Sequence, residues 1–313
     1  MARYLVTGGA GFIGSNLVEA LLARGASVRV LDDFSTGKRE NLASLEGDLE
    51  VVEGDVRDYR AVRRAVEGVE AIFHEAALPS VARSIDDPVG SNDVNVRGTL
   101  QVILAARAAG VRRVVYASSS SVYGDAPNLP KAETMAPSPL SPYAVQKLAG
   151  ELYARIALGL FGVEVLSLRY FNVFGPRQDP EGEYAAVIPR FALAALSGKS
   201  PTIFGDGRQS RDFTYVANVV EANLRALEAP REAVGEVFNV GSGERHTLLD
   251  LVRALGKIAG RPEFAARHGP ARAGDVRHSQ ASIEKARAIL GYEPRVSFEE
   301  GLERTLAWFR SRT

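Results

Sequence analysis

The amino-acid sequence predicts an α/β fold in which a doubly wound parallel sheet is joined to a second, smaller α+β lobe. Strand-like and helix-like segments alternate through the first half of the 313-residue chain. The strand-like segments are continuous apolar runs, which indicates a sheet that helices cover on both faces. After about residue 172, glycines and prolines become frequent and the alternation ends.

The order of the elements gives the expected division of the chain. Strands are expected at Arg3–Val6, Ser27–Leu31, Leu49–Val52, Ala71–His74, Val111–Ala117, Val163–Leu168 and Glu236–Val240. Helices are expected at Phe12–Leu22, Asp58–Val66, Val94–Ala109, Pro142–Gly159, Ile188–Ser197, Val216–Leu227, Leu248–Ala259, Ser282–Leu290 and Phe298–Arg310. Residues 1–172 are therefore assigned to a dinucleotide-binding domain, to which the chain is expected to return around residues 213–241. Residues 173–313 are assigned to the lobe that holds the substrate.

Composition excludes several classes of protein and site. Lys+Arg and Asp+Glu balance at 38 each, so no overall field attracts nucleic acid or an anionic membrane. The chain has no cysteine, which excludes disulfides, thiolate nucleophiles and cysteine-based zinc sites. The four histidines lack metal-ligand spacing, and no metal is expected. No apolar run approaches the length of a signal or membrane segment, so a cytoplasmic location is expected.

The segment TGGAGFIG, residues 7–14, follows a predicted strand and opens a predicted helix. Gly8 permits the tight turn, Gly11 lets the backbone approach a pyrophosphate, and Gly14 lets the helix pack closely on the strand. The N-terminus of the helix then faces the phosphates. Asp32 ends the second strand, where a carboxylate accepts hydrogen bonds from ribose hydroxyls and repels a 2′-phosphate. The sequence therefore predicts that NAD, rather than NADP, is bound.

The segment SPYAVQK, residues 141–147, predicts the chemistry of the site. Ser141 and Pro142 are typical of the first positions of a helix, and Tyr143 and Lys147 then share one face of it. A phenol with a pKa near 10 is a poor base, but a nearby ammonium and the positive nicotinamide ring lower its pKa. A shift to about 7 needs roughly 4 kcal/mol. A run of four serines (118–121) ends the strand Val111–Ala117 and offers a hydroxyl at the same edge of the sheet.

At these residues the chain resembles the nucleotide-sugar epimerases and dehydratases of the extended short-chain dehydrogenase/reductase family, which have a Rossmann fold. The resemblance covers nearly the whole chain and includes the glycine segment, HEAA (74–77), NVRGT (95–99), the serine run with VYG (122–124), SPYAVQK, RYFN (169–172), QSRDF (209–213), FNVG (238–241) and RAGD (272–275). It implies a catalytic triad of Ser119, Tyr143 and Lys147.

The resemblance also implies ligand contacts. Cofactor contacts are expected at Gly8, Gly11, Phe12, Ile13, Gly14, Asp32, Asp33, Asp55, Val56, Ala76, Asn95, Tyr143, Lys147 and Tyr170. For Asp55 two readings stay open, a position beside the adenine or a solvated loop residue. Contacts with the sugar and the nucleoside diphosphate are expected at Ser119, Tyr143, Asn172, Ala186, Val187, Arg211, Arg272, Asp275 and Ser279. Arginine suits the diphosphate because its planar fork pairs phosphate oxygens bidentately.

The serine run also indicates the reaction. In this family, hexose 4,6-dehydratases place Asp and Glu at the positions of Ser120 and Ser121, and nucleotide-sugar decarboxylases keep the Glu. Without these carboxylates a 4-keto sugar can only be reduced again, which predicts epimerisation at C4 with NAD recycled and tightly held. The expected enzyme is therefore an isomerase, a UDP-glucose/UDP-N-acetylglucosamine 4-epimerase.

Substrate preference and assembly complete the expectations. Ala186 and Ser279 stand where glucose-restricted epimerases tend to have Asn and Tyr, and small residues leave room for a 2-acetamido group. Pro79 departs from the Gly of the most similar acetyl-sugar enzymes. One alternative is a UDP-glucuronate 4-epimerase, with Arg211 and Arg177 as carboxylate partners, and another is a non-catalytic NAD-sensing module. The family commonly forms homodimers through the helices predicted at Val94–Ala109 and Tyr143–Gly159.

Overall fold

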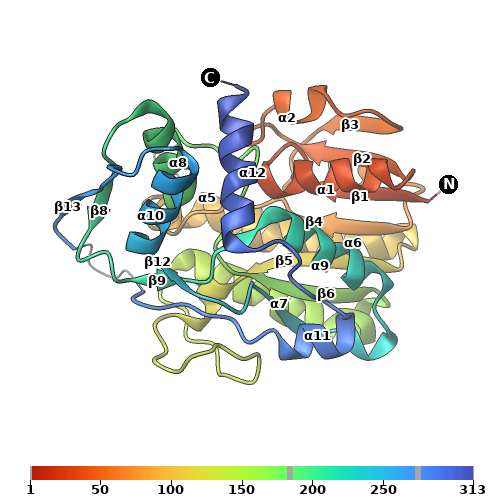
Figure 1. Ribbon diagram of the computed structural model, residues 1–313. Helices are drawn as coiled ribbons and strands as arrows, with labels where there is room; N and C mark the ends of the chain where they lie inside the picture. The colour runs from red at the N-terminus through yellow and green to blue at the C-terminus, as the bar shows by residue number, and fades with distance from the viewer. Residues whose placement is uncertain (1, 182–185, 272–275, 313) are drawn as a thin grey trace.

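The protein is built around a seven-stranded parallel sheet, as the computed structural model shows for residues 2–181, 186–271 and 276–312 (Figure 1). The strand order is β11-β6-β5-β4-β1-β2-β3. The strands are β1 (Arg3–Thr7), β2 (Ser27–Asp32), β3 (Leu49–Glu53), β4 (Ala71–His74), β5 (Arg113–Ser119), β6 (Glu164–Tyr170) and β11 (Val237–Val240). Because the order reverses between β1 and β4, a crevice is expected at their carboxyl ends. The predicted doubly wound α/β fold is confirmed.

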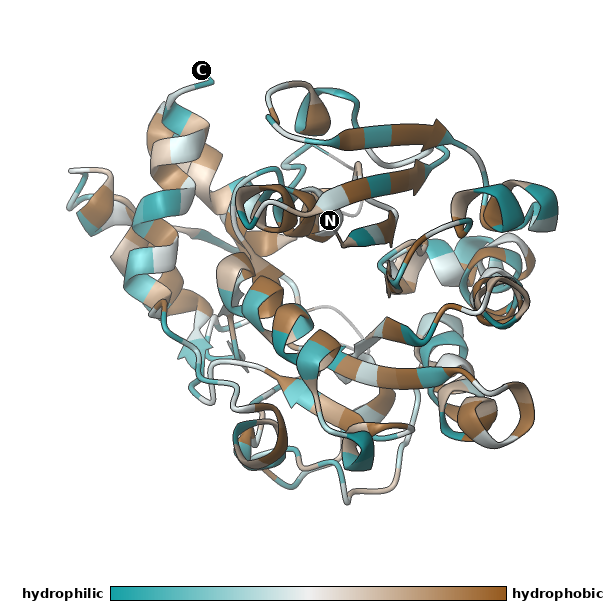
Figure 2. Ribbon diagram, turned by 90° about the vertical axis from the view of Figure 1, so that its right-hand side faces the viewer, coloured by the Kyte–Doolittle hydropathy of each residue, from teal (hydrophilic) through white to brown (hydrophobic). Residues whose placement is uncertain are grey.

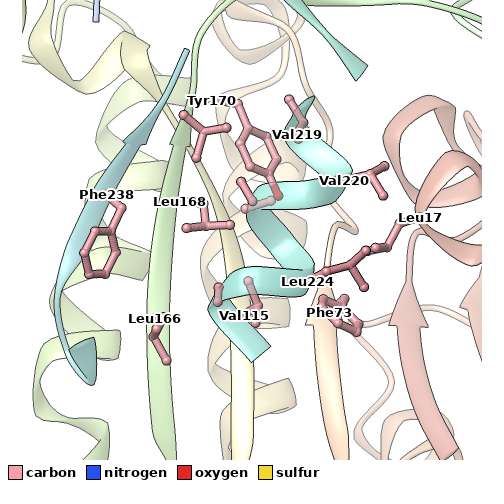
Figure 3. Close-up of a cluster of buried hydrophobic side chains, with 14 of the residues drawn as sticks. Leu17, Phe73, Val115, Leu166, Leu168, Tyr170, Val219, Val220, Leu224 and Phe238 are labelled. Carbon is pink, nitrogen blue, oxygen red and sulfur yellow. The ribbon is translucent and has the colours of Figure 1, made fainter. Parts of the chain in front are cut away.

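Helices cover both faces of the sheet. One face carries α1 (Phe12–Ala23), α9 (Val216–Glu228) and α11 (Glu284–Leu290), and the other carries α3 (Tyr59–Ala65), α6 (Thr99–Ala109) and α7 (Pro142–Phe161). Figure 3 shows the first of these cores, where Leu17 of α1 and Val219, Val220 and Leu224 of α9 face the strands. The strands are largely hydrophobic in Figure 2, whereas the surrounding helices alternate between hydrophobic and hydrophilic residues, as helices with one buried face do.

The smaller lobe lies beside the carboxyl ends of the strands (Figure 1). Its core joins α8 (Val187–Ser197), α10 (Leu248–Ile258) and α12 (Phe298–Arg310). Three short strand pairs complete the lobe: β7 (Val173–Phe174) with β10 (Thr214–Tyr215), β9 (Ser210–Arg211) with β12 (His246–Thr247), and β8 (Thr202–Phe204) with β13 (Arg267–Gly269). The lobe therefore borders the edge of the sheet where ligands bind in open α/β folds.

Two stretches after residue 172 pack in the core of the large sheet. The first contains α9 and β11, and β11 pairs in parallel with β6. The second contains α11, whose buried Ala286 and Leu290 lie in the same core as Phe238 of β11. The chain thus passes between the sheet and the smaller lobe several times, which gives the two parts many covalent connections.

The predicted helix Val94–Ala109 differs from the structure at its start. Residues Asp93–Gly98 form a π-helical turn that continues into α6. A π-helical turn shifts the side chains that follow it and often lies at a functional site. The remaining short elements are α2 (Glu40–Ala43), α4 (Val81–Asp86), α5 (Pro88–Asn92) and 3₁₀ turns at Ser120–Tyr123 and Arg231–Ala233. Among the residues described, no helix combines the length and apolarity needed to cross a membrane.

Candidate active site

The glycine segment forms a close contact between β1, α1 and β4. Gly8 has a φ of +68°, and a Cβ at this position would lie 2.7 Å from Cα of Ala76. A Cβ on Gly14 would lie 2.2 Å from the carbonyl oxygen of Gly8. Gly11 is the N-cap of α1 and has no side chain to cap the first amides of the helix. These amides are left for a ligand, and the helix dipole favours an anionic one.

Asp32 lies at the end of β2, against the glycine segment. Its two carboxylate oxygens accept hydrogen bonds from the amides of Ala10 and Phe34, both at 2.9 Å. Burial raises the pKa of the Asp32 carboxyl, and these two hydrogen bonds oppose the rise. A carboxylate oxygen accepts about two hydrogen bonds, so Asp32 keeps acceptor capacity for a ribose hydroxyl. The amides left open on α1 and the free acceptor capacity of Asp32 together fit a bound dinucleotide.

The other acidic positions near Asp32 are engaged with their own loops. Asp33 is exposed, and its Oδ1 accepts from the amide and the hydroxyl of Ser35 at 3.0 and 2.7 Å. Asp55 accepts from the amide of Arg57 at 2.7 Å and from its guanidinium at 2.6 Å. Burial would raise the pKa of Asp55, but these contacts with Arg57 lower it. Val56 is buried and lies against Gly98.

Ser119, Tyr143 and Lys147 converge at the carboxyl end of β5. The start of α7 is as predicted: Ser141 Oγ accepts the amide of Ala144 at 3.2 Å, and Pro142 is the first helical residue. Lys147 Nζ lies 5.9 Å from the centre of the Tyr143 ring. Ser119 ends β5, and its hydroxyl hydrogen-bonds the phenol of Tyr143. The site thus brings a hydroxyl, a phenol and an ammonium together beside the glycine segment.

The pKa of Tyr143 differs from the expectation drawn from the sequence. Burial raises it to about 12, the hydrogen bond from Ser119 opposes the rise, and the carboxylate of Glu75 adds to it. The protein side chains alone therefore do not lower this pKa, because the loss of water around the phenolate outweighs the effect of Ser119. The prediction also included the positive nicotinamide ring. Tyr143 is a neutral phenol at neutral pH in the protein alone.

Glu75, the first residue after β4, is not among the site residues predicted from the sequence. Its Oε1 accepts a hydrogen bond from Tyr170 Oη at 2.7 Å, and Tyr170 Oη accepts one from Asn223 Nδ2 at 2.8 Å. Burial raises the pKa of Glu75 to about 7, while Tyr170 and Lys147 oppose the rise. A carboxyl group directly after a strand of a parallel sheet lies where ligands bind. This position in the sequence could have indicated that Glu75 belongs to the site.

Asn95 lies in the π-helical turn and is 1% exposed. Its Oδ1 accepts from the amide of Leu78 at 2.8 Å, and its Nδ2 donates to Gln146 Oε1 at 2.8 Å. Gln146 is next to Lys147, and Leu78 follows the HEAA motif. Asn95 therefore ties the loop after β4 to the helix that carries Tyr143 and Lys147.

The segment 175–179, here called the latch, joins the smaller lobe to α1. The carbonyl oxygen of Pro176 accepts from Asn16 Nδ2 at 3.1 Å. Arg177, with a φ of +68°, pairs with Glu19 at 2.8 Å, and its side chain is 9% exposed. Asp179 pairs with Lys38 at 3.2 Å. Beside the latch, Phe12 and Ile13 at the start of α1 pack against the core of the smaller lobe.

The structure brings two of the predicted substrate positions together. Arg211 Nη1 donates to the carbonyl oxygens of Ser210 and Arg277 at 3.0 and 3.2 Å, and the amide of Ser279 donates to Ser210 O at 3.0 Å. Arg211 and Ser279 therefore share one neighbourhood at β9.

Three other predicted substrate positions, Asn172, Ala186 and Val187, lie on two further segments. Asn172 follows β6 with a φ of +24°, and its carbonyl oxygen accepts the amide of Thr214 at 3.2 Å. Ala186 is the exposed N-cap of α8, and Val187 is the first residue of that helix. Arg272 and Asp275 lie outside the described residues.

The histidines have structural contacts. His74 accepts from Thr7 Oγ1 at 2.7 Å and donates to Thr99 Oγ1 at 3.0 Å, because the Thr99 hydroxyl is itself donated to Asn95 O. Burial and the charge of Lys147 lower its pKa to about 3, so it is neutral. Within the described ranges, no group of three or more His, Cys, Asp or Glu side chains is arranged to hold a metal ion.

Comparisons with known proteins agree with this geometry. The profile of the "NAD dependent epimerase/dehydratase family" matches residues 4–241. The chain is 44% identical to a UDP-glucose 4-epimerase of Mycolicibacterium smegmatis, over 99% of each chain. It is 38% identical to the structure of a UDP-N-acetylglucosamine 4-epimerase from Methanobrevibacter ruminantium, with a TM-score of 0.94 over 100% and 99% of the two chains. It is 40% identical to the structure of a Thermus thermophilus UDP-glucose 4-epimerase in complex with NAD, with a TM-score of 0.89 over 99% and 100%.

Proposed function

Because this chain belongs to the NAD dependent epimerase/dehydratase family, we propose that it is an isomerase that inverts C4 of UDP-glucose and UDP-N-acetylglucosamine. The observation that carries the proposal is the convergence of Ser119, Tyr143 and Lys147 beside the glycine segment, with serines at 120 and 121. The convergence supports oxidation of a sugar hydroxyl to a ketone. The two serines favour reduction of this ketone back to a hydroxyl, since no carboxylate stands at these positions to drive elimination or decarboxylation.

The residues that would hold NAD come from the ends of several strands and from the helices beside them. The open amides of α1 at the glycine segment suit the pyrophosphate, and Asp32 suits the hydroxyls of a ribose. Ala76 borders Gly8, and Tyr170 and Lys147 lie toward the Tyr143 end of the crevice. The remaining expected cofactor contacts, including Asp33, Asp55, Val56 and Asn95, are kept as part of the proposal. NAD, when bound, supplies the hydride acceptor and donor at C4.

Proton transfer is assigned to the protein. Tyr143 would act as a phenolate, which the positive charges of Lys147 and of bound NAD favour over the neutral phenol of the protein alone. The phenolate takes the proton of the 4-hydroxyl as the C4–H bond breaks and the C4=O bond forms, and Ser119 donates a hydrogen bond to the reacting oxygen. The proton returns from Tyr143 to the sugar oxygen when the C4–H bond forms again on the opposite face of the ring. Tyr143 therefore ends the cycle in the protonation state in which it began.

The substrate groups are assigned to the smaller lobe and its border. Asn172, Arg211, Arg272 and Asp275 would bind the sugar and the nucleoside diphosphate. Ala186, Val187 and Ser279 would border the sugar, where their small or aliphatic side chains leave space for a 2-acetamido group. Arg177 is poorly placed to meet the carboxylate of a glucuronate, because its guanidinium already pairs with Glu19.

The proposal predicts turnover without added cofactor. The purified protein should interconvert UDP-glucose with UDP-galactose, and UDP-N-acetylglucosamine with UDP-N-acetylgalactosamine, because NAD is regenerated within each cycle. Chromatographic separation of the nucleotide sugars measures both reactions, with UDP-glucuronate as the third substrate. Conversion of UDP-glucuronate alone would establish the uronate epimerase instead. No conversion of any of the three, by protein that contains NAD, would favour the sensing module.

We also propose that two copies of the chain pair through α7. Val145, Leu152 and Ile156 on this helix are 53%, 53% and 42% exposed. Together with Ala149 they recur at intervals of four, three and four residues, which places them on one face. The helix α6 packs beside α7, so two chains could form a four-helix bundle. A stripe of exposed apolar side chains of this regularity favours a second copy of the same helix as its partner.

Charging this face should separate the two chains. The double variant Leu152→Glu, Ile156→Glu is expected to elute at the mass of one chain in size-exclusion chromatography with light scattering, whereas the wild type elutes at twice that mass. Val51→Glu is the matched control, because Val51 is 42% exposed on β3, at the other edge of the sheet. A wild-type protein with the mass of one chain would refute the pairing.

A further inference from the structure

Lys147 is a buried cation in need of a counter-charge. The residue is 3% exposed, and its Nζ donates to the carbonyl oxygen of Ala117 at 2.7 Å. A backbone carbonyl is a dipole and does not neutralise an ammonium. A buried ammonium without a compensating charge loses its proton instead of paying the cost of desolvation. Which carboxylate compensates Lys147 therefore decides whether it is charged in the site.

Glu151, one helical turn after Lys147, is the first candidate. Its two oxygens accept from Nε and Nη2 of Arg169 at 2.8 and 2.7 Å, and Ser118 Oγ adds a third hydrogen bond at 2.5 Å. The side chains of Glu151 and Arg169 are both 4% exposed. Glu151 still raises the pKa of Lys147, but Arg169 balances its charge, so the Glu151–Arg169 pair has no net charge. This pair leaves the charge of Lys147 largely uncompensated.

Glu75 is the other carboxylate near Lys147. It directly follows His74, which pairs with Tyr116 of β5, so Glu75 lies beside the end of β5 where the carbonyl oxygen of Ala117 accepts Lys147 Nζ. Each affects the pKa of the other: Glu75 raises the pKa of Lys147, and Lys147 lowers that of Glu75. Tyr170 fixes the orientation of Glu75, because Asn223 donates to the Tyr170 oxygen and so directs the phenol proton to Glu75 Oε1. With Glu75 ionised, the charges of the half-buried Glu75 and of the buried Lys147, Arg169 and Glu151 sum to zero.

We propose that Glu75 is a positioning residue whose carboxylate is the counter-charge of Lys147 and keeps this lysine protonated in the working site. The inference deepens the proposed epimerase function, on which its catalytic meaning rests. It gives Glu75 a role that the triad of Ser119, Tyr143 and Lys147 does not include. The same carboxylate also acts on Tyr143, whose phenol pKa it raises.

The pH range in which Glu75 ionises suits this role. Burial raises the pKa of Glu75 to about 7 and lowers that of Lys147 to about 8. Both groups therefore titrate near neutral pH, and each favours the charged form of the other. The other groups around Lys147 are the phenols of Tyr116, Tyr143 and Tyr170, whose pKa values burial raises, and His74, which is neutral. In the protein alone, none of these groups supplies a negative charge at pH 7 to 9.

The test follows the titration of Lys147 directly. In protein with ¹³Cε-labelled lysine, NMR yields the apparent pKa of Lys147, and a Lys147→Arg variant identifies its signal. Glu75→Gln keeps an oxygen that accepts from Tyr170 but removes the charge, and should lower the pKa of Lys147 by about one unit or more. The epimerase rate should also begin to fall at a pH that is lower by the same amount, because the rate depends on protonated Lys147.

Two further variants control the experiment. Glu133→Gln makes the same change at a half-buried carboxylate that also accepts one hydrogen bond, from the amide of Asn239 at 2.7 Å, and should leave the titration of Lys147 unchanged. Glu75→Asp retains the charge and should keep the lysine pKa closer to the wild-type value than Glu75→Gln does. If the glutamine variant is poorly folded, the aspartate variant still tests the proposal, since a lysine pKa that falls in spite of the retained charge contradicts it.

A Lys147 that titrates identically in the wild type and in Glu75→Gln would overturn the inference. The NMR titration needs no turnover, so its outcome is separate from that of the epimerase assay. A lowered lysine pKa in a protein without epimerase activity would uphold the charge pairing and refute the proposed reaction. An unchanged lysine pKa in an active epimerase would refute the charge pairing and uphold the proposed reaction.

Discussion

Replacing Tyr143 with phenylalanine should lower kcat on UDP-glucose by about a thousandfold or more. A positioned acid–base group contributes roughly 10² to 10⁴ in rate, and in this site the same phenol must both take and return the proton. A thousandfold loss corresponds to about 4 kcal/mol of transition-state stabilisation. Ser119 remains in place but has no partner to receive the proton. Initial rates and the amount of bound NAD, measured on the same preparation, check the prediction.

Tyr59→Phe is the control for this variant. Tyr59 is 41% exposed at the start of α3, so loss of its hydroxyl should leave the rate unchanged. Tyr143→Phe is also expected to keep its NAD, since the hydroxyl lies at the reacting end of the crevice and the glycine segment is untouched. A Tyr143→Phe enzyme that retains a tenth of the wild-type rate would show that another group moves the proton.

Replacing Gly14 with alanine should remove most of the bound NAD. The new Cβ would lie 2.2 Å from the carbonyl oxygen of Gly8 and 2.9 Å from Cα of Gly9. Both atoms belong to the backbone, so α1 and the glycine segment must move apart. Overpacking of this kind typically costs about 1–3 kcal/mol of stability. We expect an NAD affinity lower by on the order of a hundredfold, because a cost of about 2–3 kcal/mol within that range, if relieved by moving the amides that would bind the pyrophosphate, corresponds to such a factor.

The matched control is Gly159→Ala, a glycine-to-alanine change within α7 where a Cβ would meet nothing within 4 Å. This variant should keep its NAD and gain up to about 1 kcal/mol in stability from the better helix propensity of alanine. NAD content after gel filtration and the free energy of unfolding by urea measure both effects. Equal NAD content in Gly14→Ala and the wild type would show that close packing of α1 on β1 is not needed for cofactor binding.

Features that depend on local sequence were predicted well. The helix α12 lies at the predicted residues Phe298–Arg310, because Ser297 caps it and its apolar side chains recur with helical spacing. Tyr143 and Lys147 share a face because four residues separate them on one helix. Ser119 joins them because the ends of parallel strands meet at one edge of the sheet. Periodicity and strand ends therefore predicted that Tyr143, Lys147 and the serine run lie together, whereas the family resemblance singled out Ser119 within that run.

Features that depend on burial or on distant partners were not predictable in this way. The π-helical turn at Asp93–Gly98 has the apolar pattern of an α-helix, so the sequence does not separate the two. The pKa of Tyr143 depends on the water that its surroundings exclude, and the spacing of residues contains no measure of that. The pattern of α11 shows a helix with one apolar face but not which core that face meets. Arg177 and Glu19 are far apart in sequence, and only the fold pairs them.

The latch has a consequence for how the reaction is divided between moving and fixed parts. Epimerisation requires the keto sugar to turn over between two hydride transfers, whereas the hydride distance tolerates little error. Asn16 and Arg177 connect the lobe that would hold the nucleotide to the helix that would hold the cofactor. With the lobe and α1 joined in this way, only the sugar ring has to rotate. The rigidity of the latch then determines how closely each face of C4 approaches the same nicotinamide. Variants that break the contacts of the latch should therefore make the second hydride transfer less efficient. Released 4-keto sugar would be the detectable product.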